Sequence, residues 1–237
     1  CVYDMPGAAL AFAANTYTNL TDNIMPAVKT GWELMGLYEG VHYISNKRPP
    51  ESWRKRCSII VDDYKNTISF WNGSIIFLGS LDHPSLLAGK SVVHLFFDEA
   101  KYDQDKKVNR AMPILRGDAI RYGHSHYFLG VTITTDMPDV LEGEYDWYFR
   151  YVKLMKPERI LKIVQAAGEL NELRIKLVRE ENKESPSPDK LRRIKKKIIY
   201  YEAALLKMRK GESYFINASS FTNIDILTIG YIKQLFN

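Results

Sequence analysis

Cysteine is scarce in this chain of 237 residues, which contains only Cys1 and Cys57. Two cysteines exclude a disulfide framework and a cysteine-based zinc site. Long apolar runs are missing as well, because no segment approaches the roughly 20 apolar residues that are needed to cross a bilayer. No signal-peptide pattern opens the chain. These absences predict an intracellular protein with no membrane partner.

A phosphate-binding P-loop, whose pattern is G-x-x-x-x-G-K-[ST], is also missing. Gly89-Lys90-Ser91 matches the end of this pattern, but Pro84 stands where its first Gly is required. The motif also needs a following helix whose N-terminus cradles the phosphates, whereas the residues after Ser91 have the pattern of a strand. The chain therefore contains no Walker A segment. It starts at Cys1 and enters a folded pattern at once, so we expect an internal piece of a longer polypeptide.

What the chain does contain is ordinary for a globular fold, with 46% hydrophobic and 26% charged residues. This supply of apolar side chains is enough for one large domain, or for a domain with an appendage. Lys and Arg number 33 against 28 acidic residues, which gives a formal charge of +5. A charge of this size permits a polyanionic partner without requiring one.

The most informative stretch is residues 91–102, an apolar run that ends in the adjacent carboxylates Asp98 and Glu99. A strand of a parallel sheet is buried on both faces and therefore reads as a continuous apolar run. Its C-terminal end lies where open α/β sheets bind their ligands. The stretch has the form of a Walker B segment, in which the Asp holds the magnesium of a nucleoside triphosphate and the Glu orients the attacking water. The alternative is a buried strand that ends in a solvated acidic turn.

Segments before this stretch predict further strands and helices. Residues 8–14 are apolar, as in a short buried strand, and helical spacing from Leu20 to Leu37 predicts a helix after it. Residues 38–56 are polar, contain two adjacent prolines and predict a loop. Residues 67–78 predict an antiparallel hairpin whose type I′ turn is Asn72-Gly73.

After the acidic pair, residues 101–125 are charged and in part helical, and residues 127–138 predict a second buried strand. This strand ends in Thr134 and Thr135, and we expect a helix to begin near Asp139. Two hydroxyls at the C-terminal end of a neighbouring strand can bind a γ-phosphate oxygen or the attacking water. The alternative is that both threonines cap the next helix.

Two apolar stripes at helical spacing, from Ile163 to Leu177 and from Leu191 to Met208, predict an antiparallel helical hairpin. Ser187 as N-cap and Pro188 as the first helical residue start its second helix, and Gly211 ends it.

The second helix of this hairpin carries a basic cluster. Such a cluster can bind DNA phosphates electrostatically, and the alternative is a solvated helix face. Residues 213–220 then predict a strand that returns to the sheet, and residues 223–237 predict a helix. The cluster consists of Lys190, Arg192, Arg193, Lys195, Lys196 and Lys197.

In their order along the chain, these pieces resemble the ATPase domain of the large terminase subunit, the motor that packages DNA in tailed bacteriophages. The resemblance covers nearly the whole chain, from the strand and helix that follow the P-loop to the segment that leads toward the nuclease domain. The resembling segments are Ala13-Ala14-Asn15-Thr16-Tyr17, Leu86-Leu87-Ala88-Gly89-Lys90, Leu95-Phe96-Phe97-Asp98-Glu99-Ala100, Thr132-Ile133-Thr134-Thr135 and residues 218–227.

The resemblance implies a role for each matching residue. Asp98 would hold magnesium, in the second shell or through water, and Glu99 would be the catalytic carboxylate. Thr134 and Thr135 would sense the γ-phosphate of ATP and couple its hydrolysis to the movement of DNA. Lys90 is a candidate for the cation that reaches the nucleotide of a neighbouring subunit.

The resemblance also implies a fold and an organisation. The fold is α/β and P-loop NTPase-like, of the additional-strand or RecA-like kind, with a mostly parallel sheet, flanking helices and an appended antiparallel helical hairpin. Residues 1–156 form an ATPase core that lacks its P-loop strand, and residues 157–211 form the basic hairpin. Residues 212–237 lead toward a C-terminal nuclease domain that is missing from the chain.

The implied function is magnesium-dependent ATP hydrolysis coupled to the translocation of double-stranded DNA into a procapsid. The implied partners are the portal protein, the small terminase subunit and further copies of the chain in a homo-oligomeric ring. The implied location is the cytoplasm of the infected bacterium, with transient docking on the procapsid. Because Walker A is missing, we expect the chain alone to be inactive.

Two alternatives remain open from the sequence. A DEAD-like nucleic-acid helicase domain also carries Asp-Glu-Ala, but its motif continues with Asp or His where this chain has Lys101. The other alternative is a non-catalytic module that presents the basic hairpin to DNA or to a protein.

Overall fold

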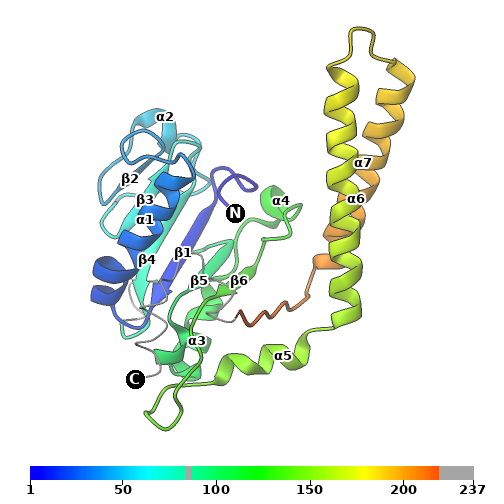
Figure 1. Ribbon diagram of the computed structural model, residues 1–237. Coiled ribbons are helices and arrows are strands. Elements are labelled where there is room, and N and C mark those ends of the chain that lie inside the picture. Colours follow the sequence, from blue (N-terminus) through cyan, green and yellow to red (C-terminus); the bar gives the residue numbers. More distant parts are fainter. Residues whose placement is uncertain (84–86, 219–237) are drawn as a thin grey trace, which may run out of the picture. The chain divides into compact units, whose positions relative to one another are not determined.

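A computed structural model of the protein describes residues 1–83 and 87–218 (Figure 1). The contacts within the chain divide it into two compact units, Cys1–Tyr148 and Phe149–Asn237. The first unit contains the sheet, and the second contains the long helices. Each unit is described by itself below.

The first unit is built on a six-stranded sheet with the strand order β2-β3-β4-β1-β5-β6. Strand β1 pairs in parallel with both β4 and β5, and β5 pairs in parallel with β6. The β2–β3 and β3–β4 pairs are antiparallel. The predicted mostly parallel α/β sheet is therefore confirmed. The strands are β1 Ala9–Ala14, β2 Tyr43–Ser45, β3 Thr67–Phe70, β4 Ile75–Ser80, β5 His94–Phe97 and β6 Gly130–Ile133.

Helices cover both faces of the sheet, which explains why β1, β4 and β5 are apolar throughout. On one face, Leu10 of β1 belongs to a cluster with Ile24 and Met25. These come from the π-helical turn Asn19–Ile24 and helix α1, Met25–Leu34. On the other face, Ala11 belongs to a cluster with Val108 of helix α3, Asp105–Ala111. Alternate residues of one strand thus enter two separate cores.

The predicted loop at residues 38–56 is wrong in part, because it contains strand β2 and the short helix α2, Glu51–Arg54. Strand β2 has only three residues and so leaves no periodic signal. The buried ring of Tyr43 holds it to the sheet, since it lies 5.0 Å from the ring of Trp32 and 6.0 Å from that of Phe70.

The predicted β3–β4 hairpin is confirmed, but its turn is not type I′. The backbone N–H of Gly73 donates to the carbonyl of Phe70, and the N–H of Phe70 donates to the carbonyl of Ser74. Only Gly73, with φ +88°, has a positive φ in this turn, whereas type I′ requires it at both central residues. The connection is a three-residue loop with a glycine in the left-handed region.

Strand β6 is half-buried rather than buried, because it lies at the end of the strand order. The helix expected near Asp139 is also absent. The carboxylate of Asp139 accepts the N–H groups of Leu141 and Glu142, and Gly143 has φ +87°. These contacts close a turn where the sequence predicted a helix start. The remaining short helices of this unit are η3 Ala100–Tyr102, η4 Met112–Ile114, α4 Ala119–Tyr122 and η5 Trp147–Phe149, the last of which runs one residue past the end of the unit.

The second unit confirms the predicted antiparallel helical hairpin. Helix α6, Pro157–Glu181, and helix α7, Pro188–Arg209, lie side by side and share an apolar core that includes Leu170, Leu173 and Leu205 (Figure 1). They are preceded by the short helix α5, Arg150–Leu154. No helix of the described residues is long and apolar enough to span a membrane.

The ends of the hairpin agree with the sequence prediction in position. Ser187 and Pro188 start α7, and Gly211 follows its end with φ +73°. The residues after Gly211 differ, because residues 213–218 form no strand. The rest of that predicted strand and the predicted helix at 223–237 lie outside the described residues.

A buried glutamate holds the turn of the hairpin together. Glu180 is 4% exposed, and its carboxylate accepts hydrogen bonds from Lys183 Nζ at 2.7 Å and from the backbone N–H of Ser187 at 3.3 Å. Lys190 Nζ lies 3.2 Å from the same carboxylate. The bond from Lys183, opposed by burial and supported by Ser187, lowers the pKa of Glu180 to about 2.

We expect Glu180→Gln to destabilise the hairpin at neutral pH. An acid whose folded pKa is lowered contributes stability above its unfolded pKa, and this contribution disappears as the pH falls toward 2. Thermal melts followed by far-UV circular dichroism should therefore separate variant and wild type at neutral pH and bring them together in strong acid. The exposed Glu184 provides the matched control, and equal shifts for Glu184→Gln would contradict the assignment.

Candidate nucleotide site

The candidate site lies where strands β1, β5 and β6 end. These strands are parallel, so their C-terminal ends meet at one edge of the sheet. Asp98 and Glu99 directly follow β5, and Thr134 and Thr135 directly follow β6. In open α/β sheets this edge is the usual place for a ligand.

The structure brings Asp98 and Thr134 into contact. Thr134 Oγ1 donates to Asp98 Oδ1 at 2.5 Å, and the backbone N–H of Thr134 donates to the carbonyl of Phe97 at 2.9 Å. The hydroxyl and the carboxylate therefore form one polar group between the ends of two neighbouring strands.

Thr135 serves a different contact. Its Oγ1 accepts the backbone N–H of Lys101 at 3.1 Å, and the carbonyl of Thr134 accepts the N–H of Ala100 at 3.4 Å. Thr135 thus holds the η3 turn behind the acidic pair. Neither threonine donates to the N-terminal turn of a following helix, which was the alternative interpretation of this pair.

Glu99 has a left-handed backbone, with φ 56° and ψ 42°. A non-glycine residue in this region is strained, and such residues are concentrated at functional sites. Its Oε2 is buried and has no hydrogen-bond partner among the described residues. Burial raises the pKa of Glu99, and the nearby carboxylates of Asp136 and Asp98 raise it further. A carboxylate with a raised pKa is suited to accept a proton from water.

Two contributors to this site were missed from the sequence. Asp136 lies close enough to Glu99 to raise its pKa more than the adjacent Asp98 does. Lys101 forms an ion pair of 3.2 Å with Glu144, in which both side chains are largely buried. The carboxylate of Glu144 also accepts the backbone N–H of Asp139 at 2.6 Å, so this pair joins the two loops beside the acidic pair. For Asp136 and Lys101 the signal was proximity alone, since each lies within two residues of a motif.

Magnesium fits the donor set on chemical grounds. Mg²⁺ prefers oxygen ligands, keeps several waters and is bound by one or two carboxylates together with substrate phosphates. Asp98 and the hydroxyl of Thr134 supply such oxygens. No group of three His, Cys, Asp or Glu side chains in the described parts of the chain could hold a metal ion alone. The residues present therefore suit a cation that arrives with a phosphate.

Lys90 is not brought to this group. It precedes β5, so it lies at the N-terminal edge of the sheet, opposite Asp98. Its Nζ lies 4.5 Å from the centre of the Phe77 ring. Gly89 has φ +79°, and the chain continues from this turn into strand β5. This agrees with the prediction that Gly89-Lys90-Ser91 is not a P-loop.

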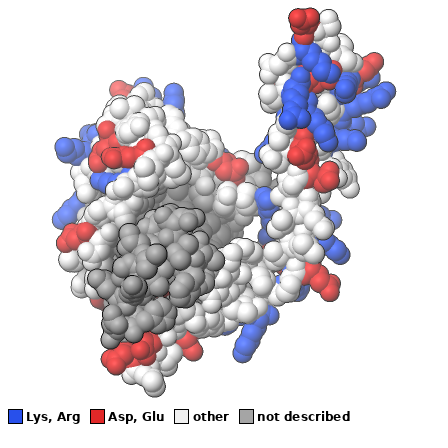
Figure 2. Space-filling view, in the orientation of Figure 1, with Lys and Arg blue, Asp and Glu red and all other residues white. Residues whose placement is uncertain are grey.

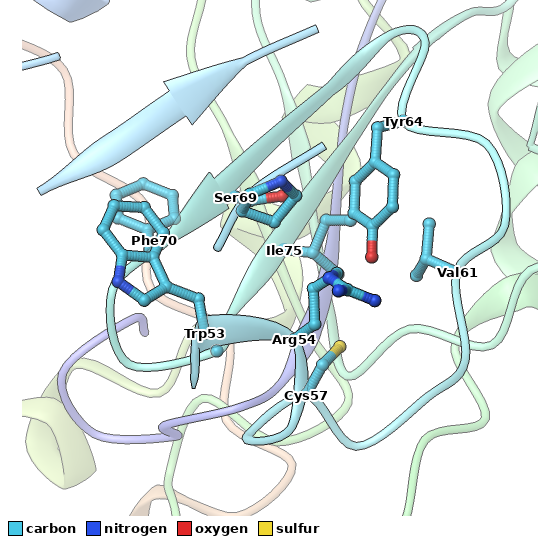
Figure 3. A pocket seen from close by; sticks show the side chains of 10 residues that line it. Trp53, Arg54, Cys57, Val61, Tyr64, Ser69, Phe70 and Ile75 are labelled. Atoms are coloured by element: carbon cyan, nitrogen blue, oxygen red, sulfur yellow. The ribbon is translucent and has the colours of Figure 1, made fainter. Parts of the chain in front are cut away.

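A small cavity beside β3 and β4 is no alternative site (Figure 3). Its volume of about 10 Å³ is that of roughly one water molecule. Two of its lining atoms, Arg54 Nε and Ser69 Oγ, are buried and have no partner among the described residues. None of the residues predicted to bind nucleotide lines it.

Asp103, at the end of the η3 turn, is fully buried. Neither of its carboxylate oxygens has a hydrogen-bond partner among the described residues. Burial raises the pKa of Asp103 to about 7, although Lys107 lowers it. The carboxylate of Asp82, which pairs with Lys107, acts in the opposite direction and raises it.

No protein-family model matches the chain, and no curated protein matches its sequence. Three similar solved structures are large terminases. That of a thermophilic bacteriophage has a TM-score of 0.38 at 14% identity and covers 57% of this chain and 28% of its own. The same enzyme in complex with ADP has a TM-score of 0.35 at 16% identity, covering 57% and 27%. The ATPase domain from Thermus phage P74-26 has a TM-score of 0.34 at 15% identity, covering 65% and 56%. The chain thus spans between about a quarter and just over half of the length of these proteins.

Proposed function

We propose that the chain supplies the Walker B half of an ATP site in a motor ATPase of the large-terminase type, which moves double-stranded DNA into a procapsid. The observation that carries the proposal is the contact between Thr134 and Asp98, beside the strained and partnerless carboxylate of Glu99. An isolated acidic turn in solvent needs neither a buried glutamate nor a hydroxyl from the next strand.

In this proposal each residue has one task. Asp98 binds Mg²⁺, directly or through water, and the metal neutralises charge on the ATP phosphates. Glu99 accepts a proton from the attacking water, for which its raised pKa suits it. Thr134, bonded to Asp98, senses the γ-phosphate, and Thr135 transmits its position to the η3 turn through Lys101.

The phosphate cradle has to come from outside the described residues. Within the described part of the sheet, β6 pairs with β5 alone. The other edge of β6 is therefore open to a further strand, and a P-loop after that strand would lie beside Thr134. We further propose that 1–156, 157–211 and 212–237 are the functional segments, and that a ring of subunits, the portal protein and the small subunit are the partners. In such a ring, Lys90 at the opposite edge of the sheet is the candidate cation for a neighbouring nucleotide.

A helicase of the DEAD-like kind is disfavoured by Lys101. The buried ion pair of Lys101 with Glu144 occupies the position where that motif continues with Asp or His.

The test compares two lengths of the protein. We expect the reading frame ahead of residue 1 to encode G-x-x-x-x-G-K-[ST], and the chain extended through it to release phosphate from ATP only with magnesium. The 237-residue chain should release none above background, because it lacks the phosphate cradle. Turnover by the shorter chain, or none by the extended one, contradicts the proposal.

A further inference from the structure

The helical hairpin carries a charged groove that is separate from the ATP site. The groove has a volume of about 890 Å³ and lies along one side of α6 and α7. Its lining includes seven cationic side chains and one acidic one, Glu180. Apart from Leu173, Ile194 and Tyr200, no other residue type lines it. The cations are Lys176, Arg179 and Lys183, from α6 and the turn that follows it, and Lys190, Arg193, Lys196 and Lys197 from α7.

Ion pairs divide the basic cluster predicted from the sequence into two sets. Lys195 pairs with Glu181 at 2.9 Å and Arg192 with Asp189 at 3.0 Å, and neither cation lines the groove. Arg174 of α6 likewise pairs with Glu202, at 2.8 Å, outside it.

The groove cations of α7 have no such partners. Arg193, Lys196 and Lys197 are exposed and form no ion pair with the described residues. The same is true of Lys176 and Arg179 on α6. Figure 2 shows Lys and Arg side chains gathered at the end of the hairpin that carries these residues. Exposed cations without partners repel one another, which favours a polyanion that neutralises them.

The spacing of the cations is regular. Lys176, Arg179 and Lys183 follow one another by three and four residues, and so do Lys190, Arg193 and Lys197. Each helix therefore presents about one cation for every turn of ~5.4 Å. The two sets lie on opposite walls of one groove. Buried Glu180 holds Lys183 and Lys190 at its end, so this part of the groove is fixed in advance.

We propose that this groove binds the phosphate backbone of double-stranded DNA without reading its sequence. Regular rows of cations match a regularly repeating polyanion, and lysines, which act as point charges, outnumber arginines in the lining. The lining contains no Asn, Gln, Ser or Thr, side chains that often read base edges in a groove of DNA. A membrane surface would require several apolar side chains beside the cations, and Tyr200 is the single lining residue among the large exposed hydrophobics. This inference rests on the hairpin alone and stands independently of the ATP site.

The test uses the full 237-residue chain and a short mixed-sequence DNA duplex, with binding followed by fluorescence anisotropy over a salt series. The groove variant is Arg193→Gln, Lys196→Gln and Lys197→Gln together. If each cation contacts one phosphate, the slope of log K against log salt becomes shallower by about 2.7.

The matched control is Arg174→Gln, Arg192→Gln and Lys195→Gln together, which removes the same charge from ion pairs outside the groove. We expect it to retain the wild-type slope, and far-UV circular dichroism should show both variants to be helical. Equal losses in the two variants would show that only net charge matters and would overturn the proposal. So would tighter binding to single-stranded DNA of equal length, to polyglutamate or to anionic vesicles.

Discussion

A Glu99→Gln variant of the protein that includes the P-loop segment is expected to lose ATP hydrolysis by about 10²- to 10⁴-fold. Glutamine has nearly the same shape as glutamate, so it preserves the packing of this residue but cannot accept a proton from water. ATP should still bind, because Asp98 and Thr134 are unchanged. Phosphate release measures the loss, and a fluorescent nucleotide measures the retained binding.

The pH profile separates this role from a structural one. A general base acts only when deprotonated, so the rate should rise with pH through the pKa of Glu99, which burial and neighbouring carboxylates raise above the ordinary range. The variant should lack this limb. Glu142→Gln is the control, because Glu142 is an exposed carboxylate of the loop after β6. Unchanged turnover in Glu99→Gln would remove Glu99 from the mechanism.

The second large effect is expected at Asp103, whose replacement by Asn should stabilise the first unit above neutral pH. The unfolded chain loses this proton near pH 3.8, whereas the folded chain keeps it until about pH 7. Because the folded state binds the proton more tightly, stability falls as the pH rises between these values. The fall corresponds to about 4 kcal/mol by slightly alkaline pH, and Asn removes it. The buried amide of Asn also lacks partners, so the net gain will be smaller.

Tryptophan fluorescence is the measurement of choice, because all four tryptophans, Trp32, Trp53, Trp71 and Trp147, lie in the first unit. Urea midpoints of wild type and Asp103→Asn should differ in alkaline buffer and converge in mildly acidic buffer. Exposed Asp146 supplies the control, and Asp146→Asn should follow the wild type at each pH. Parallel curves for wild type and Asp103→Asn would show that the Asp103 carboxylate is not destabilising.

The parts that were predicted from the sequence depend on continuous patterns. Residues 8–14 and 91–97 are uninterrupted apolar runs, and both became central strands with two covered faces. The hairpin followed from two stripes at helical spacing. The approach of Thr134 to Asp98 was also predictable, because parallel neighbouring strands end at the same edge.

The parts that were missed depend on contacts between distant residues. Strand β2 exists because Tyr43 packs on Trp32 and Phe70, which no local pattern announces. The two sets of the basic cluster could not be separated either, because the acid that pairs with Lys195 lies on the other helix. Asp136 and Glu144 likewise gain their meaning only when the loops beside β5 and β6 come together.

The strand order has a consequence for the way the chain acquires its structure. β1 is the first strand to be synthesised, yet both of its neighbours, β4 and β5, come much later in the chain. Closing such long loops is slow, whereas α6 and α7 meet across a short connection and can pair early. The helical hairpin is therefore expected to form independently of the sheet. Strand β1, which is almost wholly apolar, has to wait for its partners and is the segment that most needs protection from aggregation during folding.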